Sequence, residues 1–190
     1  MSDLPLVMDL FSGTGSATQP FVECGKHRVV RIDIAGKPDV RADVRHLPLN
    51  CRPEFVWASP PCTEFSQLTF LRVYHPGGLP PQPEKGMELV RVAFQQAQRA
   101  RWWCVENVRR SEQFIAPEFG APWLRKDAWC VWSNLPVGIQ TWGKWLKGRA
   151  ARSKPTPSGP PRYRTGDRSK IPRELAEAVH RAVCEEAGRA

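Results

Sequence analysis

The sequence lacks any apolar run that approaches the ~20 residues needed to cross a bilayer. It opens with Met1-Ser2-Asp3 and a short apolar stretch, without the basic segment and apolar core of a secretory signal. These absences argue against a membrane-spanning or exported chain. We therefore expect a soluble, cytoplasmic protein with no membrane partner.

Closely spaced cysteines are also missing. The six cysteines include no Cys-x-x-Cys pair and no tight framework. Zinc ribbons and small disulfide-stabilised domains both depend on such spacing. The sequence therefore predicts neither a metal site nor a disulfide scaffold, and it fits a reducing compartment.

Acidic residues are too few to balance the basic ones. The chain has 28 Lys and Arg against 19 Asp and Glu, which gives a formal net charge of +9. Lys and Arg that neutralise phosphates drive nucleic-acid binding through counterion release, so this excess indicates a polyanionic partner. The alternative is a charge that serves solubility alone. With 190 residues the chain is long enough for one well-buried domain, which we expect to span 1–190.

Apolar runs alternate with amphipathic segments along the chain. The runs predict strands at 4–10, 29–33, 55–59, 102–105 and 128–135. The amphipathic segments predict helices at 16–24, 87–101 and 173–187. This alternation is typical of an α/β fold in which helices flank a mostly parallel, Rossmann-like sheet. In such folds the functional residues gather at the carboxyl ends of the strands.

A glycine-containing turn follows the first predicted strand, in the segment Asp9-Leu10-Phe11-Ser12-Gly13-Thr14-Gly15-Ser16. Glycines between a strand and a helix let the backbone approach a nucleotide closely. Asp33 ends the next strand, near the offset at which an acid can accept hydrogen bonds from ribose hydroxyls. A structural tight turn is the alternative for the glycines, because the third glycine of a dinucleotide fingerprint is absent.

Two further motifs end predicted strands, Pro60-Pro61-Cys62 and Glu106-Asn107-Val108. A thiolate is a strong nucleophile that can later leave by elimination, and two prolines would hold Cys62 on a rigid turn. A carboxyl group in a partly desolvated site, such as Glu106, can share a proton with a ring nitrogen. Taken separately, the first motif is usually structural, and a lone Glu at a strand end usually caps a helix or forms a salt bridge.

In order and spacing these three motifs resemble those of the DNA cytosine-C5 methyltransferases. The similarity extends across Ala58-Ser59-Pro60-Pro61-Cys62-Thr63-Glu64-Phe65-Ser66 and Val105-Glu106-Asn107-Val108. It implies a Rossmann-like fold that binds S-adenosylmethionine and methylates C5 of cytosine through a covalent bond between Cys62 and C6.

The resemblance also implies a set of cofactor contacts. The loop of Phe11, Ser12, Gly13, Thr14 and Gly15 would hold S-adenosylmethionine, with Phe11 against the adenine. Asp33 would accept bonds from the ribose hydroxyls, and Asp43 would accept one from the adenine amino group, although an ordinary turn acid is the alternative for Asp43. The remaining implied contacts are Ile34, Val44, Pro60 and Ser169. Ser169 lies beside Lys170-Ile171-Pro172, and a helix-capping role is its alternative.

In the catalytic site the resemblance makes Cys62 the nucleophile and Glu106 the partner of cytosine N3. Arg125, in Trp123-Leu124-Arg125-Lys126, occupies the position at which the family keeps arginines that steady the cytosine. The usual Gln-x-Arg-x-Arg pattern of the family is absent at this position.

The chain departs from the family in lacking a large target-recognition region. Only a basic, Pro- and Gly-rich insert at about 137–167 stands in its place. Several of its side chains are suited to phosphates or to stacking on bases: Trp142, Lys144, Trp145, Lys147, Arg149, Arg152, Arg162, Tyr163 and Arg164. The alternative is a solvated segment with two tryptophans packed on the core.

The lack of a large recognition region suits a DNA substrate that is recognised with short or relaxed sequence specificity. It also suits a protein partner that supplies the targeting. It also suits a prokaryotic or virally encoded protein. Two other interpretations stay open from the sequence: an RNA cytosine-C5 methyltransferase, and a nucleic-acid-binding protein that has the fold without turnover.

Overall fold

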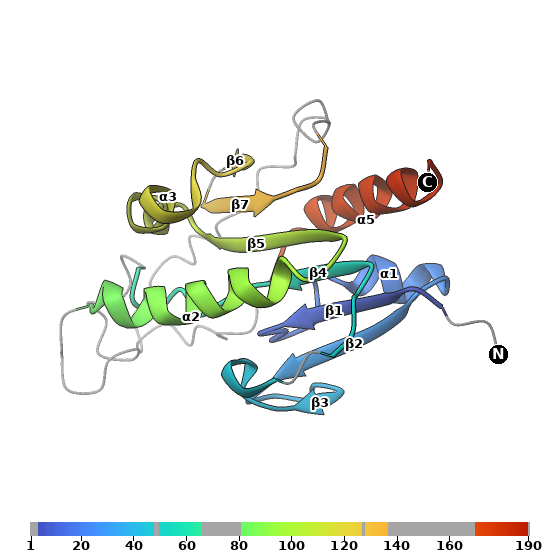
Figure 1. Ribbon diagram of the computed structural model, residues 1–190, viewed down its shortest axis with the longest axis horizontal. Coiled ribbons are helices and arrows are strands. Elements are labelled where there is room, and N and C mark those ends of the chain that lie inside the picture. Colours follow the sequence, from blue (N-terminus) through green and yellow to red (C-terminus); the bar gives the residue numbers. More distant parts are fainter. Residues whose placement is uncertain (1–3, 48–49, 66–80, 127, 137–169, 190) are drawn as a thin grey trace, which may run out of the picture.

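One seven-stranded sheet organises the chain in the computed structural model, which describes residues 4–47, 50–65, 81–126, 128–136 and 170–189. The strand order is β3-β2-β1-β4-β5-β7-β6 (Figure 1). The strands are β1 (Leu6–Leu10), β2 (Arg28–Asp33), β3 (Val40–Arg41), β4 (Phe55–Ala58), β5 (Trp102–Val108), β6 (Leu124–Lys126) and β7 (Trp129–Ser133).

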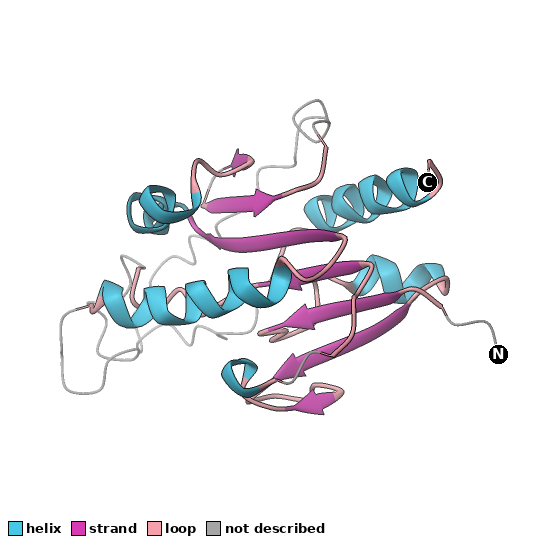
Figure 2. Cartoon of the chain, in the orientation of Figure 1, coloured by secondary structure: helices cyan, strands magenta, loops and turns pink. Residues whose placement is uncertain are grey.

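Helices cover both faces of this sheet (Figure 2). The described helices are α1 (Gln19–Cys24), α2 (Pro83–Ala97), α3 (Glu112–Phe119) and α5 (Arg173–Ala187), with 3-10 turns η1 (Val44–His46) and η3 (Arg109–Ser111). None of these helices is long and apolar enough to traverse a bilayer.

The strands from β1 to β5 pair in parallel, whereas β7 runs antiparallel to both β5 and β6. From β1 the chain turns to β2 on one side of the sheet and later to β4 on the other. The strand order therefore reverses between β1 and β4, where open α/β sheets bind their ligands. The predicted Rossmann-like α/β class, a mostly parallel sheet flanked by helices, is confirmed.

Side-chain alternation in the strands divides the core into two apolar clusters. In β4, Val56 and Ala58 pack with α2, while Phe55 and Trp57 pack with α1 and α5. All of β4 is buried, because it lies at the centre of the sheet with helices on both faces. In Figure 1, α2 runs along one side of the sheet and α1 and α5 lie on the other.

The element boundaries differ from the sequence prediction in two informative places. Helix α2 starts at Pro83 rather than Met87, because proline is well suited to the first helical position. Strand β5 continues past Glu106 to Val108, because antiparallel pairing with β7 holds it in the sheet. Glu106 therefore lies within a strand, and α3, β3 and β6 were not expected from the sequence.

The first turn of α2 packs against the residues that follow Cys62. The Glu64 carboxylate accepts a hydrogen bond of 2.6 Å from the Gln82 amide, just before the helix. A Cβ added to Gly86 would lie 2.5 Å from Cζ of Phe65, whose ring is buried. Gly86 is therefore the residue that lets the Cys62 turn and α2 meet.

We expect Gly86→Ala to destabilise the protein, although alanine favours a helix over glycine by about 1 kcal/mol. Displacing the buried Phe65 ring should outweigh that gain and lower the free energy of unfolding by about 1–3 kcal/mol. Urea unfolding measures the change. The exposed Glu88→Ala substitution in the same helix is the control and should stay within about 0.5 kcal/mol. A stabilised Gly86→Ala protein would contradict this packing.

Candidate active site

Four segments meet at the carboxyl edge of the sheet. Three are the loops after β1 (Phe11–Gly15), after β2 (from Ile34, with Asp33 as the last residue of the strand) and after β4 (Ser59–Cys62). The fourth is the end of β5. The Ser12 amide donates to the Ile32 carbonyl at 3.1 Å, and the Ser59 amide donates to the Leu10 carbonyl at 3.1 Å. Backbone hydrogen bonds thus fix the first three loops relative to one another.

The loop after β1 has an unusual backbone. Phe11, Gly13 and Gly15 all have positive φ, at 57°, 51° and 70°. For a phenylalanine this conformation costs on the order of 1–3 kcal/mol, and such strain is concentrated at functional sites. The two glycines adopt it without that cost. Gly15 also allows the Arg31 side chain to pack close, since a Cβ there would lie 2.5 Å from Arg31 Nε.

Asp33 joins the ends of two loops. One carboxylate oxygen accepts a hydrogen bond of 2.9 Å from the Gly13 amide, and the other accepts one of 2.9 Å from the Ala35 amide. The carboxylate is therefore oriented beside the glycine turn, where each oxygen keeps a further lone pair for a ligand.

The next residue, Ile34, is 66% exposed, an unusual position for a large apolar side chain. Val44 has its side chain in the core. Asp43 caps η1 and forms a bidentate pair with Arg45, whose shortest contact is 2.6 Å. Hydrogen bonds from Arg45 lower the pKa of Asp43 to about 2, so this carboxylate is charged at neutral pH.

A buried hydrogen bond holds the turn that contains Cys62. The Asn107 side-chain amide donates to the Pro60 carbonyl at 3.1 Å, which ties the turn after β4 to β5. Asn107 Oδ1 in turn accepts from the Val108 amide at 2.8 Å. Asn107 is fully buried, so the two predicted motifs are joined by a contact inside the protein.

Glu106 lies beside Cys62 in an environment that favours its protonated form. Burial raises the pKa of the Glu106 carboxyl to about 7, although a hydrogen bond with Ser59 opposes the shift. The Ser59 hydroxyl also accepts a bond of 2.8 Å from the Trp57 indole. Burial, together with the nearby Glu106 charge, raises the pKa of the Cys62 thiol. Glu106 can therefore act as a proton donor near neutral pH, while Cys62 rests as a thiol.

A second buried acid lies under the glycine turn. Burial raises the pKa of Asp9 to about 7, with the Thr18 hydroxyl hydrogen-bonded to it at 2.7 Å. Asp9 thus positions the start of α1 from within β1.

A cavity of about 170 Å³ lies between the glycine turn and the thiol–carboxyl pair. From the loop after β1 it is lined by Phe11, Ser12 and Gly13, and from the later strands by Cys62 and Glu106. Its other lining residues are Asp9, Ser16, Ala17, Ser59, Pro60, Pro61, Val108, Trp129 and Ile171. The glycine turn and the thiol–carboxyl pair therefore share one space.

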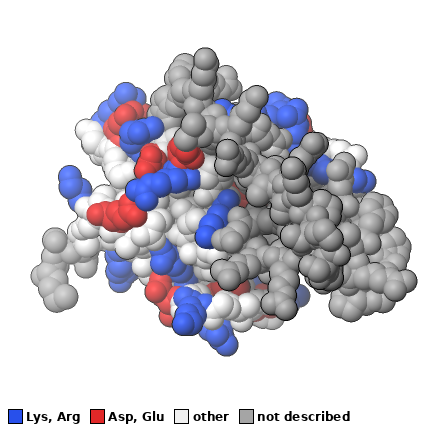
Figure 3. Space-filling view, turned by 180° about the vertical axis from the view of Figure 1, so that it is seen from behind, with Lys and Arg blue, Asp and Glu red and all other residues white. Residues whose placement is uncertain are grey.

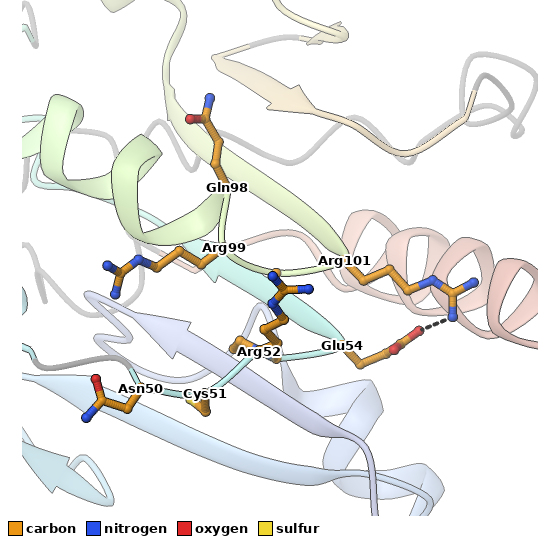
Figure 4. Close-up of a pocket in the computed structure, with 9 residues that line it drawn as sticks. Asn50, Cys51, Arg52, Glu54, Gln98, Arg99 and Arg101 are labelled. Atoms are coloured by element: carbon orange, nitrogen blue, oxygen red, sulfur yellow. Dashed lines mark hydrogen bonds and ion pairs between the residues drawn. The ribbon is translucent and has the colours of Figure 1, made fainter.

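A larger and more open hollow, of about 780 Å³, lies at the amino ends of β4 and β5 (Figure 4). Arg101 there pairs with Glu54 at 3.3 Å. Arg99 and Arg101 point in opposite directions in Figure 4, so their charges do not converge on one point. This hollow contains neither the thiol–carboxyl pair nor the glycine turn.

Seven of the predicted site residues that the structure describes are not among those that line the cavity: Thr14, Gly15, Asp33, Ile34, Asp43, Val44 and Arg125. Arg125, in β6, pairs with Glu112 of α3 at 2.8 Å and is not among the described lining residues. Ser169 lies outside the described residues, as does the predicted insert at 137–167. Thr14 is exposed on the glycine turn, outside the lining.

The sequence reasoning assigned no role to three residues that shape the site. Asn107 fixes the Cys62 turn, Ser59 hydrogen-bonds with Glu106, and Ile171 forms part of the cavity wall. The Ile171 amide donates to Ser16 Oγ at 2.9 Å, which brings the start of the C-terminal segment to the glycine turn. The motifs themselves contain Asn107 and Ser59, but no local signal in the sequence indicates the long-range contact of Ile171.

Charge is mixed over the part of the surface that Figure 3 displays in colour, where blue and red groups lie side by side. Eight Lys and Arg and one Asp occupy residues 137–169, outside the described structure. The basic excess of the chain is therefore concentrated in that segment of the sequence.

Comparison with known proteins gives limited similarity. No protein-family model matches the sequence, and no curated protein matches it. Among solved structures, the chain is similar to the delta-N METTL16 MTase domain, with 14% sequence identity and a TM-score of 0.40. The similarity covers 68% of this chain and 72% of that one. A likeness this low carries no argument about function, so the fold class rests on the sheet itself.

Proposed function

We propose that this protein is an S-adenosylmethionine-dependent DNA cytosine-C5 methyltransferase. The observation that carries the proposal is the shared cavity, in which Cys62 and Glu106 open onto the same space as the glycine turn after β1. A methyl acceptor and a nucleotide methyl donor must meet in this way for transfer between them.

The loop residues fit such a donor. Asp33 is already oriented by two backbone amides and has lone pairs left for ribose hydroxyls. Ile34 and Phe11 offer apolar surface beside it, with Ile34 left largely exposed. Gly13 borders the cavity, and a Cβ added there would meet no atom nearer than the Phe11 carbonyl at 4.0 Å. Asp43 could accept from an adenine amino group only in addition to its pair with Arg45.

S-adenosylmethionine, when bound, supplies an electrophilic methyl group. Cys62 would add to C6 of the cytosine ring, which makes C5 nucleophilic, and would leave by elimination once the C5 proton is lost. The buried hydrogen bond between Asn107 and Pro60 holds the turn on which the sulfur sits. Because burial keeps the resting thiol protonated, substrate binding must promote its ionisation.

Glu106 would bond to cytosine N3. A protonated carboxyl group can donate there and draw electron density from C6, which favours attack by the thiolate. Its pKa of about 7 keeps a substantial protonated fraction at neutral pH. The bonded chain from Trp57 through Ser59 fixes the carboxyl in place.

The proposed substrate is DNA, with the target base flipped out or already single-stranded, because a cytosine inside a duplex is out of reach of the cavity. The basic segment at 137–169 supports a polyanionic partner through its excess of Lys and Arg. Arg125 stays a prediction as a cytosine contact, since reaching the base would require it to leave Glu112.

The cofactor assignment predicts a loss of affinity in Asp33→Ala. Removing a charged hydrogen-bond acceptor for the ribose should weaken S-adenosylmethionine binding about 10- to 100-fold, measured by calorimetry. The matched control is Asp39→Ala, because the Asp39 carboxylate also accepts a backbone amide, that of Arg31 at 2.8 Å, whereas the Asp33 carboxylate is bonded to the glycine turn. Equal weakening in both variants would mean that loop order alone is being measured.

The reaction is tested by mass spectrometry of nucleosides from DNA of cells that express the protein. We expect 5-methyldeoxycytidine with the intact chain and none with Cys62→Ala, because the ring cannot be activated without the thiol. Cys51→Ala, which removes an exposed thiol away from the cavity, should retain the product. Unchanged DNA together with methylated cytidine in RNA would show that RNA is the substrate. No methylated product in either nucleic acid would favour a nucleic-acid-binding protein without turnover.

The pKa of Glu106 predicts the pH profile. Below pH 7 the carboxyl is protonated and kcat/KM should rise with pH as the thiolate fraction grows. Above pH 7 the growing thiolate fraction is offset by loss of the Glu106 proton, so kcat/KM should level off. Glu106→Gln, which cannot ionise, should be about 100-fold less active at pH 7. Its kcat/KM should keep rising to pH 9, and a plateau in this variant would assign the pH 7 transition to another group.

A further inference from the structure

A cluster of two cysteines and two histidines lies away from the cavity, where the end of α1 meets α5. Cys24 is the last residue of α1, His27 precedes β2, and His180 and Cys184 lie one turn apart on α5. Cys24 Sγ is 3.3 Å from His27 Nδ1, and Cys184 Sγ is 3.4 Å from His180 Nε2. One ligand atom from each of Cys24, His27 and His180 can be chosen so that all lie within 4.8 Å of one another.

Within each cysteine–histidine pair the separation is close to that of two ligands in a tetrahedral zinc site. Bond lengths of about 2.3 Å to sulfur and about 2.05 Å to nitrogen place neighbouring sulfur and nitrogen ligands about 3.5 Å apart. The two observed sulfur–nitrogen distances, 3.3 and 3.4 Å, differ little from that value. All four side chains are partly buried, so the cluster is enclosed while an ion can still reach it.

The local fold explains why the two cysteine–histidine pairs lie near each other. Gly25, with φ of 66°, ends α1 in a left-handed turn that brings His27 back toward Cys24. The four-residue spacing of His180 and Cys184 places both on one face of α5. The Phe21 ring packs edge-on against both imidazoles, at centroid distances of 5.1 Å to His27 and 4.8 Å to His180.

We propose that Cys24, His27 and His180 bind one Zn²⁺ ion and that the Cys184 side chain, beside His180, turns toward them to supply the fourth ligand. Two thiolates and two neutral imidazoles match the structural class of zinc site, in which the protein supplies all four ligands. Binding replaces two S–H bonds with two Zn–S bonds and releases two protons to solvent, which leaves a complex of zero net charge. The pairs Cys24-x-x-His27 and His180-x-x-x-Cys184 come from opposite ends of the chain, so the missing Cys-x-x-Cys spacing did not reveal them.

The ion would fasten the C-terminal helix to the first helix. Helix α5 follows Ile171, which forms part of the cavity wall and is bonded to Ser16 in the glycine turn. Exposed Arg173 of α5 also pairs with Glu23 of α1 at 2.8 Å. Exposed ion pairs contribute little, so a metal that joins α1 and α5 would hold the wall in place far more strongly.

The test is zinc binding by the full-length, reduced protein. We expect one zinc per chain by elemental analysis, a thermal midpoint that rises with zinc and falls with a chelator, and a Co²⁺ derivative with the visible and thiolate charge-transfer bands of a tetrahedral sulfur–nitrogen site. X-ray absorption should report two sulfur and two nitrogen ligands. These measurements need no variant, so they hold even if a substitution prevents folding.

Variants then identify the ligands. Cys24→Ser and His180→Asn should each weaken zinc binding by at least about 100-fold, since loss of a mere second-sphere partner already costs 10- to 100-fold. The controls are Cys51→Ser and His46→Asn, two exposed side chains outside the cluster, which should bind zinc like the unaltered protein.

Three results would overturn the proposal: no zinc on the reduced protein, zinc retained in Cys24→Ser, or zinc lost in Cys51→Ser. A mass lower by two hydrogens, mapped to a Cys24–Cys184 disulfide in a protein that binds no zinc after reduction, would replace the metal site with a redox pair. None of these outcomes depends on methyltransferase activity, so the test of the zinc site is independent of the proposed function.

Discussion

The position of β4 between β1 and β5 is the constraint on which the site depends. All four of its residues are buried, and it pairs in parallel with both neighbours. Its register sets Ala58 beside Leu10 and Val105, so the turn that follows it must emerge between the glycine turn and Glu106. The hydrogen bond from Asn107 to Pro60 then fixes the turn to β5. Cys62 is placed by the sheet rather than by its own loop.

Two buried acids beneath this edge oppose the stability of the fold. Asp9 and Glu106 both have pKa values of about 7, above the 3.8 and 4.5 of the free groups, because burial disfavours their charge. The folded state therefore holds protons that the unfolded state has released. The free energy of unfolding therefore falls as pH rises from about 4 to 7. Above pH 7 both groups are ionised in the folded and the unfolded state, so the free energy of unfolding stays at the lower value. A group kept at such a cost is typical of a working site.

The sequence predicted the central strands of the sheet well, because a buried strand is marked by a short run of consecutive apolar residues. The runs at 29–33 and 55–59 correspond to β2 and β4, and the helix predicted at 173–187 is α5. The short edge strands β3 and β6 were not predicted, because two or three residues are too few to show a periodic pattern of apolar and polar side chains. Cys62 and Glu106 were paired from motif order, and the structure places them on one cavity. The partners of Asn107 and Arg125 could not be predicted, since they lie 47 and 13 residues away in the sequence and meet only in the folded chain.

The two edges of the sheet are its shortest strands. β3 has two residues and β6 three, and each carries basic side chains: Arg41 on β3, and Arg125 and Lys126 on β6. Short, charged edges offer few free amides and carbonyls to a passing strand. Two molecules of this protein that meet would therefore find little opportunity to join their sheets, so a high local concentration need not lead to aggregation.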